Sequence, residues 1–405
     1  MAVIALFSGT HCHGEELAGQ VALNLNYRMI TDRDLIAETG KRFQLDESKL
    51  NRALFDKPSI FNKFTHEKER ALACLKHVLA NLVGQDQQVF FGYSCHLIPR
   101  DIAHVLRVGV IADMKYRVAH LMGQEGVSEK EALKKLHRDD ENLALWVDTC
   151  VSSKDPWSTE LYDILIPMDK STVAEATKLI VENAGKEVLK VSDGSMRSVE
   201  DFRLATRVEL LLAKEGHQVG VSARDAVVSL TINKHVLKLA ALETELKRIA
   251  GTVPGVKDVE TKVGPGYYQT DIYRKFDFEV PSKVLLVDDE REFVHMLSDR
   301  LEMRDLGAAV VYDGEQALAA VSEEEPEVMV LDLKMPGIDG IEVLRRVKSE
   351  HPNVEVIVLT GHGSEEIRKR CMELGACAYL EKPVDIETLT KTMKEAYRQA
   401  QEKKA

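Results

Sequence analysis

The stretch VMVLDLKMPGIDG, residues 328–340, decides the fold of the last third of this chain. Its first four residues are apolar and too few for a buried helix, so they predict a central strand of a parallel sheet. Pro336 and Gly337 form a turn soon after that strand. Asp332 therefore follows a strand directly, at the edge where open α/β sheets hold their ligands. This carboxylate is either a reactive group or an ordinary strand-end aspartate.

The region around this stretch repeats one pattern of strand and helix. The expected strands are 284–287, 308–312, 328–331, 354–359 and 378–380. The expected helices are 291–304, 314–322, 340–350, 365–374 and 386–401. This alternation predicts a doubly wound parallel sheet, a flavodoxin-like (βα)5 domain over residues 282–405.

Polar side chains stand where the expected strands end. Asp288 and Asp289 follow the first strand, Thr360 follows the fourth and Lys382 follows the fifth. In the strand order 2-1-3-4-5 the first and third strands are neighbours, so Asp288, Asp289 and Asp332 crowd one edge. A divalent cation with oxygen ligands relieves their repulsion, which predicts Mg²⁺. Lys382 adds a fixed positive charge nearby.

The segments VLLVDDE, VLDLKMPGIDG, VIVLTGHG and YLEKP, in this order and spacing, resemble a response-regulator receiver domain over residues 282–405. The resemblance implies that Asp332 is the phosphoacceptor. It would take a phosphoryl group from a phosphohistidine of a histidine kinase or a phosphotransfer protein. It also implies that Asp289, Asp332 and the carbonyl group of Lys334 hold Mg²⁺, while Asp288 shapes and charges the pocket.

The same resemblance assigns the switch residues. Lys382 would pair with a phosphoryl oxygen, Thr360 would be the switch hydroxyl and Tyr379 the coupled aromatic. The added phosphoryl charge, about −1.5 to −2, is then the signal. Receiver domains often pair through their fourth and fifth helices, so the resemblance also makes a homodimer an open expectation.

The beginning of the chain has the shape of a phosphate-binding loop. Residues 3–7 are an expected strand, residues 8–14 a turn with Gly9 and Gly14 at its ends, and residues 15–25 a helix. Helix N-terminal amides can receive an anion, and the Gly spacing fits a P-loop. A P-loop continues with Lys and then Ser or Thr, whereas this chain has Glu15 and Glu16. These carboxylates would repel a polyphosphate.

The segments FSGTHCHGEELA, ITDRDLI, HVLRVGVIADMKYRVAHLM, VSEKEALKKLHRDD and LYDILIPMD resemble the cytidylate kinase-like branch of the nucleoside monophosphate kinases. The resemblance covers residues 1–187 and implies a P-loop kinase-like parallel sheet. Its candidate nucleotide-binding residues are Gly9, Thr10, Gly14, Asp32, Arg33 and Arg117.

Three positions depart from the family, because Glu15, Tyr93 and Asn142 stand where such kinases carry cations. We therefore expect a degenerate domain kept for ligand sensing or protein contact. An ATP-using nucleoside monophosphate kinase regulated by phosphorylation is the alternative.

Histidine and cysteine side chains stand on the same expected edge of this first sheet. His11, Cys12 and His13 lie in the first loop, and Cys95 and His96 lie just past the third strand. Imidazole and thiolate groups suit Zn²⁺ or copper, so these residues are candidates for a metal or redox site. The other reading is a loop whose nucleotide role has relaxed.

The middle of the chain, residues 192–266, predicts the order αββαβ. With its Pro-Gly-Val ending near residue 255, this order is similar to a BON domain, a small α+β fold. The resemblance implies ligand, partner or lipid contact, and a packing module is the plainer alternative. Residues 267–281, with interleaved aromatic and charged residues, predict a linker.

Composition limits the partners and the compartment. The chain has 405 residues, a formal net charge of −12 and six cysteines without a CxxC motif. The charge disfavours DNA and anionic membranes, the cysteines predict reduced thiols, and no apolar run approaches a membrane span. We therefore expect a cytoplasmic α/β multidomain protein, a two-component response regulator with a non-DNA-binding output and an unidentified output partner.

Overall fold

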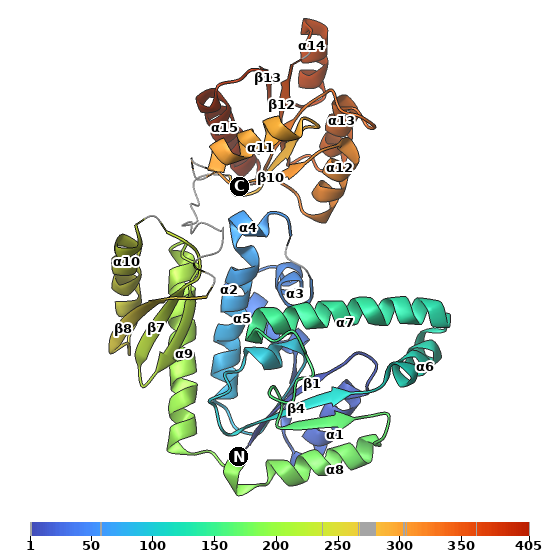
Figure 1. Ribbon diagram of the computed structural model, residues 1–405, viewed down its shortest axis with the longest axis vertical. Helices are drawn as coiled ribbons and strands as arrows, with labels where there is room; N and C mark the ends of the chain where they lie inside the picture. Colours follow the sequence, from blue (N-terminus) through green and yellow to red (C-terminus); the bar gives the residue numbers. More distant parts are fainter. Residues whose placement is uncertain are drawn as a thin grey trace. The chain divides into compact units, whose positions relative to one another are not determined.

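The computed structural model describes residues 2–56, 59–236, 238–265, 267, 281–302, 304, 306–361 and 363–404, without the side chains of 63, 64 and 402–404 (Figure 1). By their contacts, the residues form two compact units. The first unit holds residues 1–57, 68–214 and 218–273, and the second holds residues 58–67, 215–217 and 274–405. The predicted linker 267–281 lies outside the described residues apart from Tyr267 and Pro281.

A five-stranded parallel sheet forms the centre of the first unit, in the order β2-β3-β1-β4-β5. Its strands are β1 (Val3–Ser8), β2 (Arg28–Thr31), β3 (Gln88–Phe91), β4 (Val105–Ile111) and β5 (Ile164–Pro167). The first five residues of β1 are all buried, because helices cover both faces of the sheet. Alternate residues of β1 enter different apolar clusters, Phe7 on one face and Leu6 on the other.

Helices α1 and α8 cover one face of this sheet, and helices α2, α3, α5 and α7 cover the other (Figure 1). The helical segments of this part are α1 (Gly14–Leu25), α2 (Asp32–Phe43), α3 (Glu47–Phe55), α5 (Glu67–Val83), η1 (Tyr93–Leu97), α6 (Met114–Glu125), α7 (Glu129–Val151), α8 (Val173–Ala184) and η2 (Glu187–Leu189). A capping box of Ser128 and Glu131 begins α7, which runs on to Val151.

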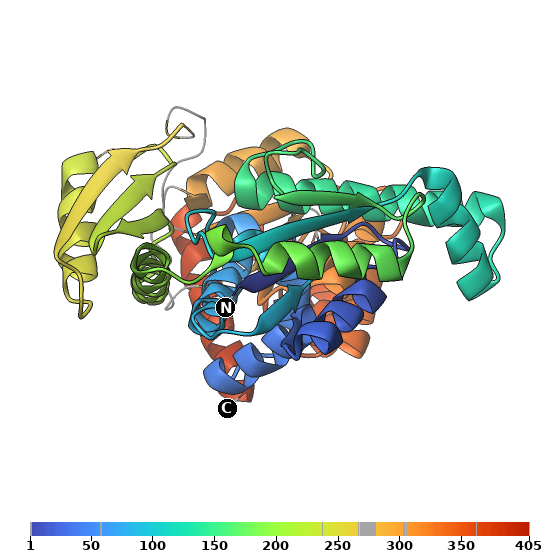
Figure 2. The ribbon, with the colours of Figure 1, turned by 90° about the horizontal axis from the view of Figure 1, so that it is seen from below.

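A small three-stranded sheet completes the first unit, in the order β6-β7-β8. It comprises α9 (Asp193–Lys214), β6 (Gly220–Arg224), β7 (Val227–Ile232), α10 (Leu239–Gly251) and β8 (Asp258–Val263), which is the predicted αββαβ order. Alternate residues of β7 are fully buried, so only one face of the sheet packs against α9 and α10 (Figure 2). The first half of α9 packs instead on the core of the large sheet, through Val199 and Phe202.

The second unit is built on a parallel sheet in the order β10-β9-β11-β12-β13, which confirms the predicted order 2-1-3-4-5. Its strands are β9 (Val284–Val287), β10 (Ala308–Val311), β11 (Val328–Leu331), β12 (Glu355–Thr360) and β13 (Ala378–Glu381). Its helices are α4 (Asn62–Thr65), α11 (Arg291–Glu302), α12 (Gly314–Glu323), α13 (Gly340–Glu350), α14 (Glu365–Glu373) and α15 (Ile386–Lys404).

Two apolar layers flank this second sheet. One layer holds residues of α12 and α13, and the other holds residues of α11 and α15. Every residue of β9, β11 and β12 is buried, which fits central strands covered on both sides. Within the described residues, no helix has both the length and the apolar composition that crossing a bilayer demands.

Candidate functional site

Three carboxylates gather where β9 and β11 end. These strands are parallel neighbours, so Asp288, Asp289 and Asp332 leave the sheet at the same edge. One ligand atom of each residue lies within 4.8 Å of those of the other two. Asp288 and Asp332 are buried, whereas Asp289 is exposed. The structure therefore brings the three predicted carboxylates together, with one of them open to water.

Lys382, which follows β13, supplies the positive charge of this edge. Its Nζ lies 2.7 Å from Asp288, 2.9 Å from Asp332 and 3.1 Å from Glu290. It also lies 4.6 Å from the centre of the Phe293 ring, an arrangement in which a cation is attracted to the ring face. Burial lowers the pKa of Lys382, but hydrogen bonds to Asp288 and Asp332 outweigh burial and raise that pKa above its ordinary value. The lysine is therefore charged at neutral pH.

The backbone holds the second oxygen of Asp332. The amides of Leu333 and Lys334 donate to Oδ1 over 2.6 and 3.3 Å. The turn after β11 closes against α13 at Gly340, where an added Cβ would lie 2.2 Å from the Asp332 carbonyl oxygen. Only glycine allows the backbone of α13 to come this close to Asp332. Gly340 therefore helps to position the Asp332 carboxylate. The side chain of Lys334 is exposed.

The predicted switch residues lie on the neighbouring strands β12 and β13, Thr360 at the strand end and Tyr379 two positions before it in register. Thr360 ends β12 and is fully buried. Tyr379 lies on β13, in register with Val358. Its hydroxyl is buried and has no hydrogen-bond partner among the described residues, and an added Cβ on Gly363 would meet it at 2.2 Å. Tyr379 therefore occupies a position without a polar partner of its own.

The donor set fits a hard divalent cation. Carboxylate oxygens are the ligands that Mg²⁺ prefers, and three of them converge here. The exposed Asp289 leaves one side of the group open to water, which Mg²⁺ keeps as ligands.

The first unit has a cavity at the corresponding edge of its own sheet. It measures about 630 Å³ and is lined by the loop between β1 and α1, by the start of α2 and by the end of β3. Of the predicted nucleotide-binding residues, Gly9, Thr10, Gly14, Asp32 and Arg33 line it. His11, Cys12 and His13 line it as well, together with Glu15 and Glu16.

The buried charges of this cavity region are already engaged. Arg117 forms hydrogen bonds of 2.7 and 2.9 Å to Asp140, and it also holds the carbonyl and hydroxyl oxygens of Thr10. Asp32 accepts hydrogen bonds from the amides of Tyr93 and Ser94, and burial raises its pKa. Both side chains therefore tie loops together.

The predicted histidine and cysteine group does not converge. Cys12 belongs to the apolar cluster on one face of the first sheet, and Cys95 belongs to the cluster on the other face. Burial raises the pKa of both thiols, that of Cys12 to about 11. His96 packs edge-on against Phe7, and its Nε2 lies 3.2 Å from the Tyr162 hydroxyl.

This placement corrects the prediction of a shared metal or redox site. The sheet itself separates the cysteines, because the loop after β1 places Cys12 in the cluster on one face and η1 places Cys95 in the cluster on the other. Within the described parts of the chain, three or more histidine, cysteine, aspartate or glutamate side chains come together in one place only. That place is the group of carboxylates that follow β9 and β11.

Three residues that contribute to these two sites were not predicted from the sequence. Glu290 and Phe293 both contact Lys382, and Asp140 neutralises Arg117. Glu290 directly follows the Asp288-Asp289 pair, so its place in the sequence could have predicted that it lies near Lys382. Asp140 lies 23 residues from Arg117 on another helix, and no local pattern connects the two.

Comparisons with known proteins match two parts of the chain. Residues 284–394 match the response regulator receiver domain, and residues 3–170 match the cytidylate kinase-like family. The chain is 35% identical over 112 residues to sporulation initiation phosphotransferase F of Bacillus subtilis (strain 168), covering 28% of this chain and 90% of that protein.

Other matches cover a similar share of the chain. The transcriptional regulatory protein YesN of Bacillus subtilis (strain 168) is 35% identical over 116 residues, 28% of this chain and 32% of that protein. The solved receiver domain of the Francisella response regulator 1452 is 29% identical, with a TM-score of 0.28, over 29% of this chain and 98% of that structure. The chain thus spans about a third of the length of YesN. Through residues 284–394, the chain belongs to the response regulator receiver family.

Proposed function

We propose that this protein is a two-component response regulator whose receiver is phosphorylated on Asp332. The observation that carries the proposal is the convergence of three carboxylates within 4.8 Å, with the Nζ of Lys382 2.9 Å from Asp332. The donor is the phosphohistidine of a histidine kinase or phosphotransfer protein. A carboxylate oxygen of Asp332 forms a bond to phosphorus, the P–N bond breaks, and the histidine nitrogen leaves with its electron pair and takes up a proton.

The surrounding residues prepare this step. The amides of Leu333 and Lys334 hold Oδ1, so the carboxylate is oriented before the donor arrives. Lys382 lies where it can move from Asp332 to an oxygen of the incoming phosphoryl group. Asp288, Asp289 and Asp332, with the Lys334 carbonyl, would hold Mg²⁺, which when bound supplies positive charge against the phosphoryl oxygens.

The added negative charge is read by Thr360 and Tyr379. Thr360 ends β12 at the same edge as Asp332, so its hydroxyl can be drawn toward the phosphoryl group. Tyr379, whose hydroxyl has no partner among the described residues, can then turn into a different position. This two-state pair is the proposed switch.

The output is proposed to be ligand or protein binding by the kinase-like region. The match to the transcriptional regulatory protein YesN covers 28% of this chain, and residues 3–170 match a different family. The net charge of −12 disfavours DNA. We further propose the domain boundaries 1–187, 192–266 with a BON-like fold, and 282–405. A cytoplasmic location is in keeping with the six free thiols.

A phosphorylation-regulated nucleoside monophosphate kinase is the second candidate, favoured by the cavity of about 630 Å³ at the β1 loop. The engaged Arg117 and the loop carboxylates count against it. Turnover of CMP with ATP and Mg²⁺, lost in Arg33→Met, would establish this candidate. Absence of turnover with each nucleoside monophosphate would exclude it.

Incubation with acetyl phosphate and Mg²⁺ tests the main proposal. We expect one phosphoryl adduct by intact mass, stable in acid and labile in base. Peptide mapping should locate it on Asp332. Omission of Mg²⁺ should prevent it, and an adduct on another residue would refute the assignment.

A further inference from the structure

A short segment of the kinase-like region belongs to the receiver by its contacts. Residues 59–66 lie in the sequence between α3 and α5 and Glu67 begins α5, yet residues 59–67 group with the second unit. Phe61 is fully buried, in the apolar cluster that also holds Leu285 of β9 and Val321 of α12. The receiver core therefore contains an aromatic ring that its own sequence, residues 282–405, does not supply.

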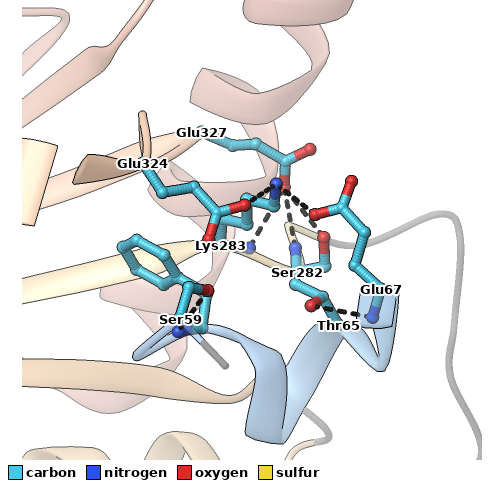
Figure 3. Close-up of polar contacts among 8 residues, drawn as sticks. Ser59, Thr65, Glu67, Ser282, Lys283, Glu324 and Glu327 are labelled. Carbon is cyan, nitrogen blue, oxygen red and sulfur yellow. Dashed lines mark hydrogen bonds and ion pairs between the residues drawn. The ribbon is translucent and has the colours of Figure 1, made fainter. Parts of the chain in front are cut away.

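A partly buried ion pair involves the same segment, and the side chain of its Glu67 is 29% exposed. Figure 3 shows Lys283 between the carboxylates of Glu67 and Glu324, with its Nζ 2.8 and 2.5 Å from their oxygens. The side chain of Lys283 is 16% exposed, and that of Glu324 is 8% exposed. Burial lowers the pKa of Lys283, but hydrogen bonds to Glu324 and Glu67 outweigh burial and raise it. Two carboxylates thus hold one buried ammonium, and one of them comes from a residue 216 positions away.

Local hydrogen bonds shape both sides of this contact. On the segment, the Phe61 amide donates to Ser59 Oγ, and the Glu67 amide donates to Thr65 Oγ1 (Figure 3). On the receiver, the amides of Ser282 and Lys283 donate to Glu327 over 2.8 and 3.2 Å. These bonds fix the backbone from which Phe61, Glu67 and Lys283 project in the docked structure.

The contact lies at the end of the sheet opposite to Asp332. Lys283 directly precedes β9 and Glu327 directly precedes β11, while Asp288 and Asp332 follow the same two strands. Each strand has four residues, which at roughly 3.3 Å per residue separates the two ends by about 13 Å or more. Tyr379 packs against the apolar cluster that also holds Phe61, whereas the ion pair joins Lys283 to Glu67 and Glu324.

We infer that residues 59–67 are a docking segment that the receiver holds through Phe61 and Glu67, independently of the charge on Asp332. Burial of the ring favours the docked form, and the ion pair, which lies at the start of β9, does not involve the carboxylate edge. The inference does not require Asp332 to be phosphorylated.

Hydrogen exchange on the full chain tests the docking. In Phe61→Ala we expect amides of residues 59–67 and of β9 to exchange at least tenfold faster than in wild type. Ile60→Ala is the matched control, because Ile60 is 44% exposed, and it should exchange like wild type. Glu67→Gln preserves the shape and removes the charge, so a smaller increase confined to the same peptides is expected. Wild-type exchange in both Phe61→Ala and Glu67→Gln would overturn the inference.

Unfolding of a variant can be separated from undocking. Trp146 and Trp157, the only tryptophans, lie in the first unit, so native fluorescence in Phe61→Ala shows that this unit stays folded. Wild-type exchange of α15, in the other apolar layer of the second sheet, shows the same for the receiver. Asp332→Asn should leave exchange of residues 59–67 within twofold of wild type, with or without acetyl phosphate and Mg²⁺. Release of the segment in Asp332→Asn, or in a wild-type sample that carries the adduct, would overturn the independence. Failure to form the adduct counts against phosphorylation alone, because the variants still decide the docking.

Discussion

The two large sheets of this chain have the same kind of edge, where parallel strands end, but the charged residues at the two edges differ. Each is a five-stranded parallel sheet with loops at the carboxyl ends of its strands. At the receiver edge, one lysine faces two buried carboxylates, with a third carboxylate exposed to water. At the kinase-like edge, the buried Arg117 is paired with Asp140, and Glu15 and Glu16 line the cavity. The fold therefore sets where a ligand can bind, and the charges decide which ligand.

The two edges also differ in whether the cationic side chain can change its partners when a ligand binds. Lys382 contacts residues that would themselves hold a metal or accept a phosphoryl group, so its partners can change during a reaction. Arg117 holds the Thr10 loop, and moving it toward a phosphate would break three sets of contacts at once. A charged side chain such as Arg117, whose hydrogen bonds stabilise the fold, is not available to bind a ligand.

Asp332→Asn should have the largest effect, a complete loss of the phosphoryl adduct, because the amide is a far weaker nucleophile than the carboxylate. Intact mass after incubation with acetyl phosphate and Mg²⁺ is the measurement. Asp299→Asn, at an exposed position on α11, should be phosphorylated like wild type. Persistence of the adduct in Asp332→Asn would remove the contrast between the two edges.

Arg117→Met should lower the free energy of unfolding of the first unit by about 3 kcal/mol, because it leaves Asp140 and Thr10 without their partner. Urea unfolding followed by tryptophan fluorescence reports on this unit, which holds both tryptophans. Arg138→Met is the control, since the side chain of Arg138 is 70% exposed and 3.9 Å from Asp139, and it should change the free energy by less than about 0.5 kcal/mol. Equal values for both variants would mean that Arg117 is free for a ligand.

Acid should weaken the first unit through His96. Burial lowers the pKa of His96 to about 4, whereas its ordinary value is 6.5. The folded state therefore resists protonation, so the stability is complete above pH 6.5 and falls as the pH drops toward 4. The loss is about 1.4 kcal/mol per pH unit, or about 2 kcal/mol between pH 6.5 and 5.

Urea unfolding at several pH values checks this slope. In His96→Gln the slope should become shallower, with a remainder from His77, whose pKa burial also lowers to about 4. His137→Gln, at an exposed position of α7, should keep the wild-type slope. An unchanged slope in His96→Gln would show that the histidine at this edge titrates freely.

Exchanging the loop charges should have the smallest effect. The double change Glu15→Lys and Glu16→Thr should raise the affinity for ATP about tenfold, or about 1.4 kcal/mol, because it replaces repulsion by attraction at a helix N-terminus. Titration calorimetry measures the affinity. Glu38→Lys, a charge reversal at an exposed position on α2, should give no such gain. Equal affinities for ATP in the two variants would mean that the charges of Glu15 and Glu16 do not explain the difference between the two edges.

Much of the fold could be predicted because its signals are local. Buried runs such as residues 284–287 and 328–331, each followed by a helix, predicted the receiver strands and their order. Asp288, Asp332 and Lys382 could be expected to lie together, because a parallel sheet brings its strand ends to one edge. The predicted grouping of Cys12 with Cys95 failed, since a loop position does not tell which face of the sheet a side chain enters.

The sequence by itself determined the strands, their order and the acidic edge around Asp332. Apolar periodicity and strand-end position are properties of a few consecutive residues, so they can be read along the chain. Tertiary structure alone decided that Asp140 neutralises Arg117, and that Phe61 and Glu67 belong with the receiver. Each of these contacts joins residues that only folding brings together. Whether a charge is free or paired depends on such neighbours, because burial and pairing set its energy.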